Sequence, residues 1–132
     1  MPGIYALIDP DGRLHFRDGD TRTMLKDPDA AQTGPVAFTI LRAQGRAQGL
    51  CGYTGDDSLP SGQQSNPLGQ ALLAAFGSPE PPIHGTLAIC GTHAVPGDTM
   101  AGLCGLSDPQ QRLIRSVHAR VRQETEEAGH RP

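Results

Sequence analysis

Three cysteines and one histidine have the types and spacing that come closest to a chemical site. Cys90 and His93 form a Cys-x-x-His pair, and Cys104 follows eleven residues after His93 across a glycine-rich segment. Two ligands at this spacing can meet one metal ion on a turn, and thiolate and imidazole are ligands that zinc favours. With Cys51 or His84 as the fourth ligand, the pattern describes a tetrahedral zinc site.

The same residues have two other interpretations. Cys90 ends an apolar run, where a cysteine often serves as a small buried hydrophobic residue. His93 could also lower the thiol pKa of Cys104 or Cys90 and create a nucleophile, although no local pattern supplies an oxyanion hole or a third orienting group. Structural zinc sites usually contain two tight ligand pairs and this chain has one, so the buried structural role is favoured.

Glycine-rich loops at 61–66 and 97–105 lead into predicted helices, where free backbone amides could bind an anion. Neither loop has the Lys-Ser/Thr of a phosphate-binding loop, and nearby aspartates would repel a phosphate. A small-ligand pocket under these loops is therefore a weaker hypothesis than ordinary connecting loops. The acidic pairs at 18–20, 27–29 and 56–57 lie among turn-forming residues, so turn formation and capping explain them.

The elements that must position these residues begin with strands. An Asp-Pro-Asp-Gly turn at 9–12 favours a β-hairpin over 4–17. Apolar runs rich in β-forming residues extend the pattern. They predict strands at 36–41, 47–53 and 83–90, with a short helical turn near 21–26.

Two helices follow from capping signals. An Asn-Pro pair at 66–67 predicts a helix over 66–76, because asparagine caps free amides and proline suits the first helical position. A serine and an aspartate at 107–108, each with a glutamine three residues later, offer a capping box for a helix over 108–126. Acidic residues crowd the end of that helix, where its dipole favours positive charge, so the tail 127–132 is expected to fray.

These elements predict a single α+β domain over 1–126, with a mainly antiparallel sheet of about five strands and two helices, 66–76 and 108–126, packed on one face. The length of 132 residues suits one domain. The connection from the strand that ends at Tyr53, through the first helix, to the strand at 83–90 allows one parallel pairing in the sheet.

Composition argues against several classes of protein. The chain has 11 basic and 14 acidic residues and a net charge of -3, so its electrostatics gives no support to nucleic-acid binding. Its apolar runs are far shorter than the ~18 residues of a membrane span, and its start lacks a signal-peptide pattern. Three cysteines leave at least one unpaired, which argues against a disulfide framework. We therefore expect a cytoplasmic protein without nucleic-acid or membrane partners.

Two helix surfaces are candidates for protein contact. Leu73 lies off the core stripe of the 66–76 helix, and that helix is so apolar that we expect both the sheet and a partner subunit to cover it. Arg112, Arg115 and Arg122 lie opposite the apolar stripe of the second helix and could dock an acidic partner. These four residues are the predicted interaction site.

Five stretches in the middle of the chain form a recognisable series: 53–57 (YTGDD), 66–67 (NP), 71–72 (AL), 83–91 (IHGTLAICG) and 97–98 (GD). This series resembles an uncharacterised small-protein family of actinobacteria and their phages. The family has no assigned activity. The resemblance implies a small soluble domain associated with phages or mobile elements, and it implies no catalytic residue.

The sequence thus favours a non-enzymatic binding or regulatory module, which acts through contact with a protein partner or with itself and needs no cofactor. This interpretation depends on aliphatic residues forming the scaffold while the thiol and imidazole groups lie apart. The alternative is a small cysteine- or zinc-dependent enzyme centred on Cys90, His93 and Cys104.

Overall fold

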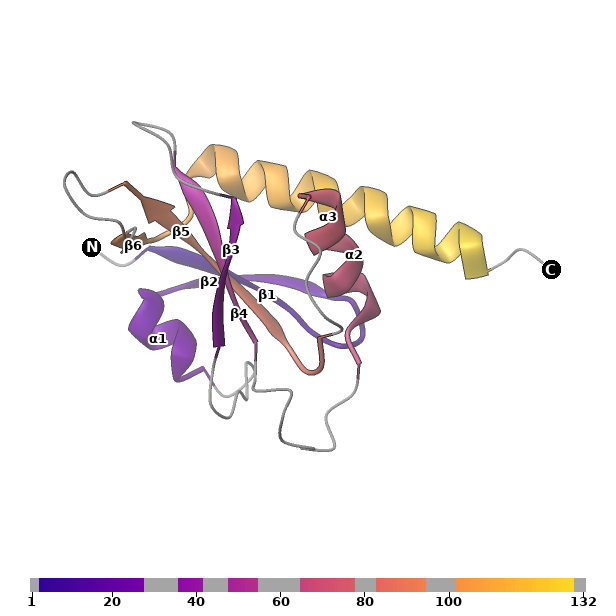
Figure 1. Cartoon of the computed structure of the whole chain (residues 1–132), viewed down its shortest axis with the longest axis horizontal. Coiled ribbons are helices and arrows are strands. Elements are labelled where there is room, and N and C mark those ends of the chain that lie inside the picture. The colour runs from indigo at the N-terminus through magenta and orange to yellow at the C-terminus, as the bar shows by residue number, and fades with distance from the viewer. Residues whose placement is uncertain are drawn as a thin grey trace.

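The computed structural model describes residues 3–27, 36–41, 48–54, 65–77, 83–94 and 102–129. Within these ranges the chain forms strands β1 to β6 and helices α1 to α3, in the order β1-β2-α1-β3-β4-α2-β5-β6-α3 (Figure 1). The strands build one sheet, and the helices lie on its two faces.

The predicted hairpin is confirmed. β1 (Ile4–Ile8) pairs antiparallel with β2 (Leu14–Asp18). At the turn, the Gly12 N–H donates to the Asp9 carbonyl at 2.8 Å, and Gly12 has a φ of 89°, which glycine adopts without a Cβ clash. The Asp9 side chain accepts from the Arg13 N–H at 2.9 Å. The local turn chemistry read from the sequence therefore accounts for this element.

The strand pairings among the described residues are all antiparallel, in the order β2-β1-β5-β4-β3, and β6 pairs with β5. The parallel pairing that the sequence allowed is wrong, because Tyr53 lies opposite Ala88 in an antiparallel register. β5 begins at the end of the sheet where β4 stops, so the connection through α2 returns the chain instead of crossing over. The remaining strands are β3 (Val36–Leu41), β4 (Gly49–Thr54), β5 (Leu87–His93) and β6 (Gly102–Cys104).

Alternate side chains divide the sheet into two faces. On one face, Ile8 joins the main core together with side chains of α2 (Pro67–Ala75) and α3 (Asp108–Gly129). On the other face, a second buried cluster includes Met24 of α1 (Thr21–Leu25). Figure 1 shows α2 and α3 on one side of the sheet and α1 on the other. The predicted α+β class, with two long helices on one face of a mainly antiparallel sheet, is confirmed.

Asn66 precedes α2, as predicted, and it is a buried hydrogen-bonding centre. Its Oδ1 accepts from the Gly69 N–H at 2.9 Å, and its amide donates to the carbonyls of Ile8 and Gly85, each at 2.9 Å. The residue is 1% exposed. One side chain thus caps α2 and ties it to β1 and to the segment that precedes β5.

The buried face of α2 is wider than predicted. Leu68 and Leu72 lie in the core, and Leu73, which the sequence placed off the core stripe, is also completely buried, whereas Ala75 is exposed. α2 packs against α3 as well as the sheet, which explains why two adjacent positions are both covered. Leu73 is therefore a core residue within one chain, and this corrects its assignment to a contact surface.

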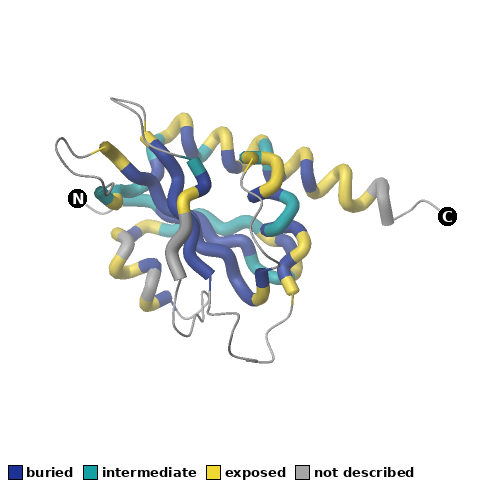
Figure 2. Tube along the Cα trace, in the orientation of Figure 1, coloured by how far each residue is buried: buried dark blue, intermediate teal, exposed yellow. Residues whose placement is uncertain are grey.

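α3 begins with the predicted capping box. The Ser107 hydroxyl accepts from the Gln110 N–H at 3.3 Å, and the Gln110 Oε1 accepts from the Ser107 N–H at 3.0 Å. The Gln110 amide also donates to the Gly49 carbonyl of β4 at 2.8 Å. The helix continues to Gly129, three residues past its predicted end, and beyond Val121 every side chain described is exposed (Figure 2).

Candidate functional site

The structure does not bring Cys90, His93 and Cys104 to one point. β5 continues through His93, and residues three apart in a strand point to opposite faces, so Cys90 and His93 face away from each other. Cys90 is 1% exposed in the cluster that faces α1, whereas Cys104 lies near Gln110 at the start of α3. Among the described residues, no three His, Cys, Asp or Glu side chains are placed to hold one metal ion. The zinc interpretation thus lacks a convergent set of ligands in this part of the chain.

Cys104 lacks the surroundings of a reactive thiol. Burial raises the pKa of the Cys104 thiol, which disfavours the nucleophilic thiolate. Its contact with the Gln48 amide is long, at 3.8 Å. His93 lies against Gly102, its partner in the β5–β6 pairing, and no hydrogen bond between His93 and the Cys104 thiol occurs in the described structure.

The thiols are expected to react slowly with an alkylating reagent such as iodoacetamide, because Cys51 and Cys90 are buried and the raised pKa of Cys104 leaves little thiolate at neutral pH. The Cys104 rate should rise only at a higher pH than that of free cysteine, because its pKa is raised, and His93→Ala should leave the rate unchanged. Mass spectrometry of tryptic peptides measures each rate. A Cys104 that reacts faster than free cysteine at neutral pH, and slows in His93→Ala, would restore the nucleophile interpretation.

A different cysteine pair lies on the face that carries α1. Cys51 and Cys90 stand directly opposite each other in β4 and β5, and both are buried close to Tyr53. Burial, and after it the thiols of Cys51 and Cys90, raise the pKa of Tyr53 to about 12. The phenol therefore stays protonated in the physiological range, and the three side chains belong to the second core cluster.

Several acidic and glycine-rich segments considered in the sequence extend beyond the described residues. The acidic pair at 56–57 lies entirely outside them, and the pair at 27–29 has only its first residue inside. Of the two glycine-rich loops, the structure describes 65–66, just before α2, and 102–105, which include β6. The hypothesis of a ligand pocket under these two loops stays a prediction.

The described residues contain a pocket that is open to solvent, between the β1–β2 hairpin and α1. Its volume is about 690 Å³. Two aromatic residues, two cations, two carboxylates and one threonine line it. We call it the hairpin pocket; its lining residues are Tyr5, Phe16, Arg17, Asp18, Thr23, Lys26 and Asp27.

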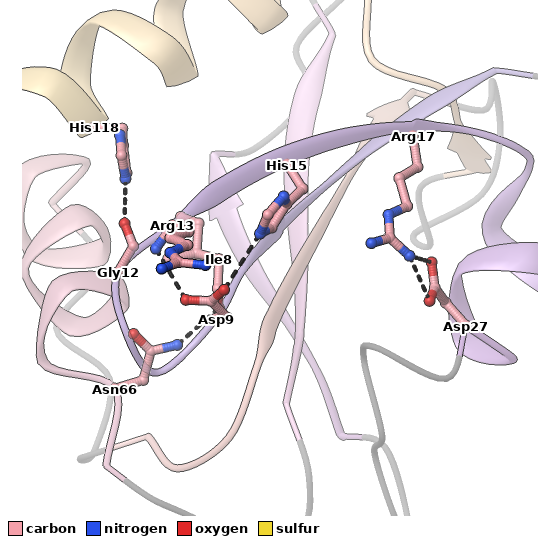
Figure 3. A network of polar contacts seen from close by, with 9 residues as sticks. All are labelled: Ile8, Asp9, Gly12, Arg13, His15, Arg17, Asp27, Asn66 and His118. Carbon is pink, nitrogen blue, oxygen red and sulfur yellow. Dashed lines mark hydrogen bonds and ion pairs between the residues drawn. The ribbon is translucent and has the colours of Figure 1, made fainter.

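A buried carboxylate organises one wall of the hairpin pocket. The Tyr5 hydroxyl donates to Asp27 at 2.6 Å, and one guanidinium nitrogen of Arg17 donates to both Asp27 oxygens, at 2.9 and 3.0 Å. The Asp27 side chain is 3% exposed and that of Arg17 is 35% exposed. Hydrogen bonds to an ionised group are among the strong ones in proteins. The network therefore holds the end of α1 against β1 and β2. Figure 3 shows the contact between Arg17 and Asp27.

α1 has only five residues, and contacts at its start and centre add to the Asp27 network. The Asp20 side chain accepts from the Thr23 N–H at 2.8 Å and from the Thr23 hydroxyl at 2.9 Å. These bonds lower the pKa of the Asp20 carboxyl below its usual value. Met24 is completely buried in the second core cluster. The sequence-predicted helical turn is confirmed, and these contacts position it beside the hairpin.

The hairpin turn is held from the opposite side by α3. The His118 Nε2–H donates to the Gly12 carbonyl at 2.7 Å, and His118 is 8% exposed. Asp9 lies 3.2 Å from the His15 ring (Figure 3). Burial opposes ionisation of Asp9, but hydrogen bonds from Arg13 and His15 outweigh it and lower the pKa of the Asp9 carboxyl. β2, at one edge of the sheet, is thus fixed to both helical layers.

The predicted arginine residues of α3 are exposed. Arg122 lies 3.4 Å from Glu126, one helical turn away. The Arg115 guanidinium lies over the Phe16 ring, 5.1 Å from its centroid, so α3 and β2 meet at this point. No carboxylate in the described ranges forms an ion pair with Arg112 or Arg115.

The hairpin pocket does not follow from the sequence patterns. Asp27 belongs to an acidic pair that the sequence assigns to a turn, and Arg17 is the last residue of the predicted hairpin. In the hairpin register, Tyr5 lies opposite Arg17, and both side chains project on the same face of the sheet. The position of the 9–12 turn sets this register, so the pairing of Tyr5 with Arg17 could be predicted from the sequence. The third member of the network depends on α1 folding back across the sheet, which no local pattern predicts.

The hairpin pocket offers binding chemistry: an aromatic surface, hydrogen-bonding groups and the exposed cation of Lys26. No family model, curated protein or solved structure matches this chain. No helix in the part of the chain that the structure describes is both long enough and apolar enough to cross a membrane. The resemblance to the family of actinobacteria and their phages stays a prediction.

Proposed function

We propose that this protein is a non-enzymatic binding module that docks an acidic segment of a partner protein on the exposed face of α3. One observation carries the proposal. Arg112 and Arg115 are exposed, and within the described ranges neither has a carboxylate partner, whereas Arg122 has Glu126. An exposed guanidinium that has no carboxylate partner can form paired hydrogen bonds with the carboxylate of another molecule.

A protein partner suits this face better than a second copy of the chain. In a two-fold interface centred on α3, Arg112 and Arg115 of one copy would approach the same arginines of the other, and like charges repel. Leu113, which is 43% exposed, borders the arginines and gives the partner an apolar contact. Self-association through another surface stays a prediction.

The proposal is tested with a fluorescein-labelled peptide of alternating glutamate and valine, called the Glu–Val peptide, and fluorescence anisotropy at low salt. We expect the protein to bind this peptide and to ignore the matching lysine–valine peptide. The double variant Arg112→Glu/Arg115→Glu should weaken binding by about tenfold, because two attractive pairs, each contributing ~0.2 to 1 kcal/mol, become repulsive.

The control is Arg22→Glu/Arg120→Glu, which changes the net charge by the same amount. Arg22 lies on α1, on the other side of the sheet, and Arg120 already lies 4.0 Å from Glu124. An equal loss of affinity in both double variants, or no binding by the unmodified protein, would show that α3 has no acidic partner. A dimer in sedimentation that Arg112→Glu/Arg115→Glu dissociates would assign the face to self-association and overturn the proposal.

A further inference from the structure

We infer that the acidic segment binds as an extended strand added to the free edge of β2. This inference rests on the proposed function, because it states the form in which that partner is held. Strand addition supplies main-chain hydrogen bonds for affinity, and alternate side chains of the added strand enter sites on the two faces of the sheet. The backbone pattern of β2, the position of the hairpin pocket and the charges beside the edge support the inference.

The register of the hairpin shows which backbone groups of β2 point outward. The Gly19 N–H donates to the Gly3 carbonyl at 2.8 Å, and the Asp9 N–H donates to the Arg13 carbonyl at 3.1 Å. Hydrogen-bonded pairs alternate with non-bonded pairs along an antiparallel ladder. Between those two bonded pairs, His15 and Arg17 therefore bond inward to β1. The outward N–H and C=O groups belong to Leu14, Phe16 and Asp18.

β2 is an edge of the sheet, and in the described structure only β1 pairs with it. An unpaired edge is a ready template for another extended chain. The hairpin pocket lies at this edge, because Phe16, Arg17 and Asp18 line it together with Thr23 and Lys26 of the α1 segment. A strand placed beside β2 would therefore find room on the α1 side for its side chains.

The two sides of the edge differ in chemistry. On the α3 side, Arg115 lies over the Phe16 ring, so a glutamate or aspartate of the added strand can meet a guanidinium beside an aromatic surface. On the α1 side, Lys26 is exposed, and no ion pair involving it occurs in the described structure. Asp18 shares the α3-side face of β2 with Phe16, two residues away, and would repel a carboxylate placed directly beside it. The occupant is therefore an extended segment with an acidic residue toward Arg115, an uncharged residue beside Asp18, and uncharged residues on the α1 side.

A second copy of β2 is a poorer occupant of this edge. Antiparallel pairing of two β2 strands about Phe16 places His15 opposite Arg17 of the other copy, and it brings the two α3 helices together on their arginine-bearing sides. Neither the His15–Arg17 contact nor the contact between the two α3 helices pairs opposite charges, so neither stabilises the dimer electrostatically. An acidic segment of a different protein meets the same cations with attraction.

The first test uses a backbone variant at the edge. Asp18→Pro removes one outward N–H and leaves the bonds to β1 intact, because Asp18 occupies a non-bonded position. Asp18→Ala removes the same charge and keeps the N–H, so it is the matched control. We expect the affinity for the Glu–Val peptide to fall about tenfold in Asp18→Pro, through the lost bond and the blocked edge, and to be equal or higher in Asp18→Ala.

The second test measures amide hydrogen exchange in the unmodified protein and so does not depend on the variant folding. In the free protein, the amides of Leu14, Phe16 and Asp18 should exchange faster than those of His15 and Arg17. Saturation with the Glu–Val peptide should slow the first three by about tenfold or more. If these three amides are already protected in the free protein, the edge is covered and the inference is wrong.

The outcomes separate this inference from the proposed function. A Glu–Val peptide whose alternate amides are N-methylated keeps its charges but cannot form the ladder on that side. If it binds as well as the parent peptide, and Arg112→Glu/Arg115→Glu still weakens binding, strand addition is wrong and docking on α3 stands. If only N-methylation and Asp18→Pro weaken binding, strand addition stands and the arginine face is not the docking site.

Discussion

Asn66→Ala is expected to lower the free energy of unfolding by about 3 to 5 kcal/mol, because it leaves three buried backbone groups without their partner. These groups are the Gly69 N–H and the carbonyls of Ile8 and Gly85. Asn66 is 1% exposed, so water cannot easily replace the lost bonds. Since small domains are stable by only ~5 to 15 kcal/mol, the variant should be close to unfolded. Urea denaturation followed by circular dichroism measures the loss.

Two companion variants separate the contributions of Asn66. Ser107→Ala removes only a helix cap, since Ser107 accepts from Gln110 at the start of α3, and it should cost about 1 kcal/mol. Asn66→Asp keeps the oxygen that caps α2, but it replaces the amide group that donates to two carbonyls with a carboxylate oxygen, which repels them. The variant should therefore be at least as destabilising as Asn66→Ala at neutral pH. A loss in Asn66→Ala no larger than that in Ser107→Ala would mean that the two carbonyl bonds contribute nothing.

Asp27→Ala is the second large effect, with an expected loss of about 2 to 3 kcal/mol in the free energy of unfolding. Removing one member of a buried ion pair usually costs about 3 to 5 kcal/mol, because the other charge loses its partner. The Arg17 side chain is 35% exposed, whereas Asp27 is 3% exposed, so water recovers part of the loss at Arg17. Thermal and urea unfolding of Asp27→Ala against the unmodified protein give the value.

A double-mutant cycle with Tyr5 tests whether the network acts as one unit. Tyr5→Phe removes the hydroxyl that donates to Asp27 at 2.6 Å and should cost about 1 to 2 kcal/mol. In the Asp27→Ala background the same change should cost at least about 1 kcal/mol less, because the acceptor is already gone. Purely additive losses would show that the Tyr5 hydroxyl gains no stability from Asp27, and the wall of the hairpin pocket would then depend on packing alone.

The Asn66 and Asp27 networks join elements that strand addition requires to be rigid. Asn66 holds β1 through the Ile8 carbonyl, and His118 holds the hairpin turn through the Gly12 carbonyl. Asp27 holds α1 against the base of β2. A flexible edge strand binds an added strand more weakly, because part of the binding free energy is used to order the edge strand. These buried polar contacts would hold the β2 edge in place for the proposed strand addition.

Elements defined by neighbouring residues were predictable from sequence. The 9–12 turn indicated the hairpin, the Asn-Pro pair at 66–67 indicated α2, and the capping box at Ser107 indicated α3. Each signal operates within four residues, so it does not depend on the rest of the fold. The exposed arginines of α3 follow in the same way from helical periodicity.

The predicted zinc or nucleophile site is not formed because one strand is longer than the sequence pattern indicates. The predicted strand ends at Cys90, so His93 would follow it in a turn and could fold back toward Cys90. In the structure β5 runs on to His93 because β6 supplies hydrogen-bonding partners for its last three residues. β6 itself lies in a glycine-rich segment with weak strand propensity, and pairing with β5 overrides that propensity. Extension by three residues places Cys90 and His93 on opposite faces.

The sequence by itself determined the turns, the helix starts, the α+β class and the charged face of α3, since each follows from contacts within a few residues. The tertiary structure alone decided the antiparallel pairing of β4 with β5, the burial of Leu73, the union of Tyr5, Arg17 and Asp27, and the open edge of β2. The physical reason is distance along the chain. The strands that pair with each other, and the elements that bury a given face, are far apart in the sequence. Which of them pair or pack together depends on the free energy of the whole fold.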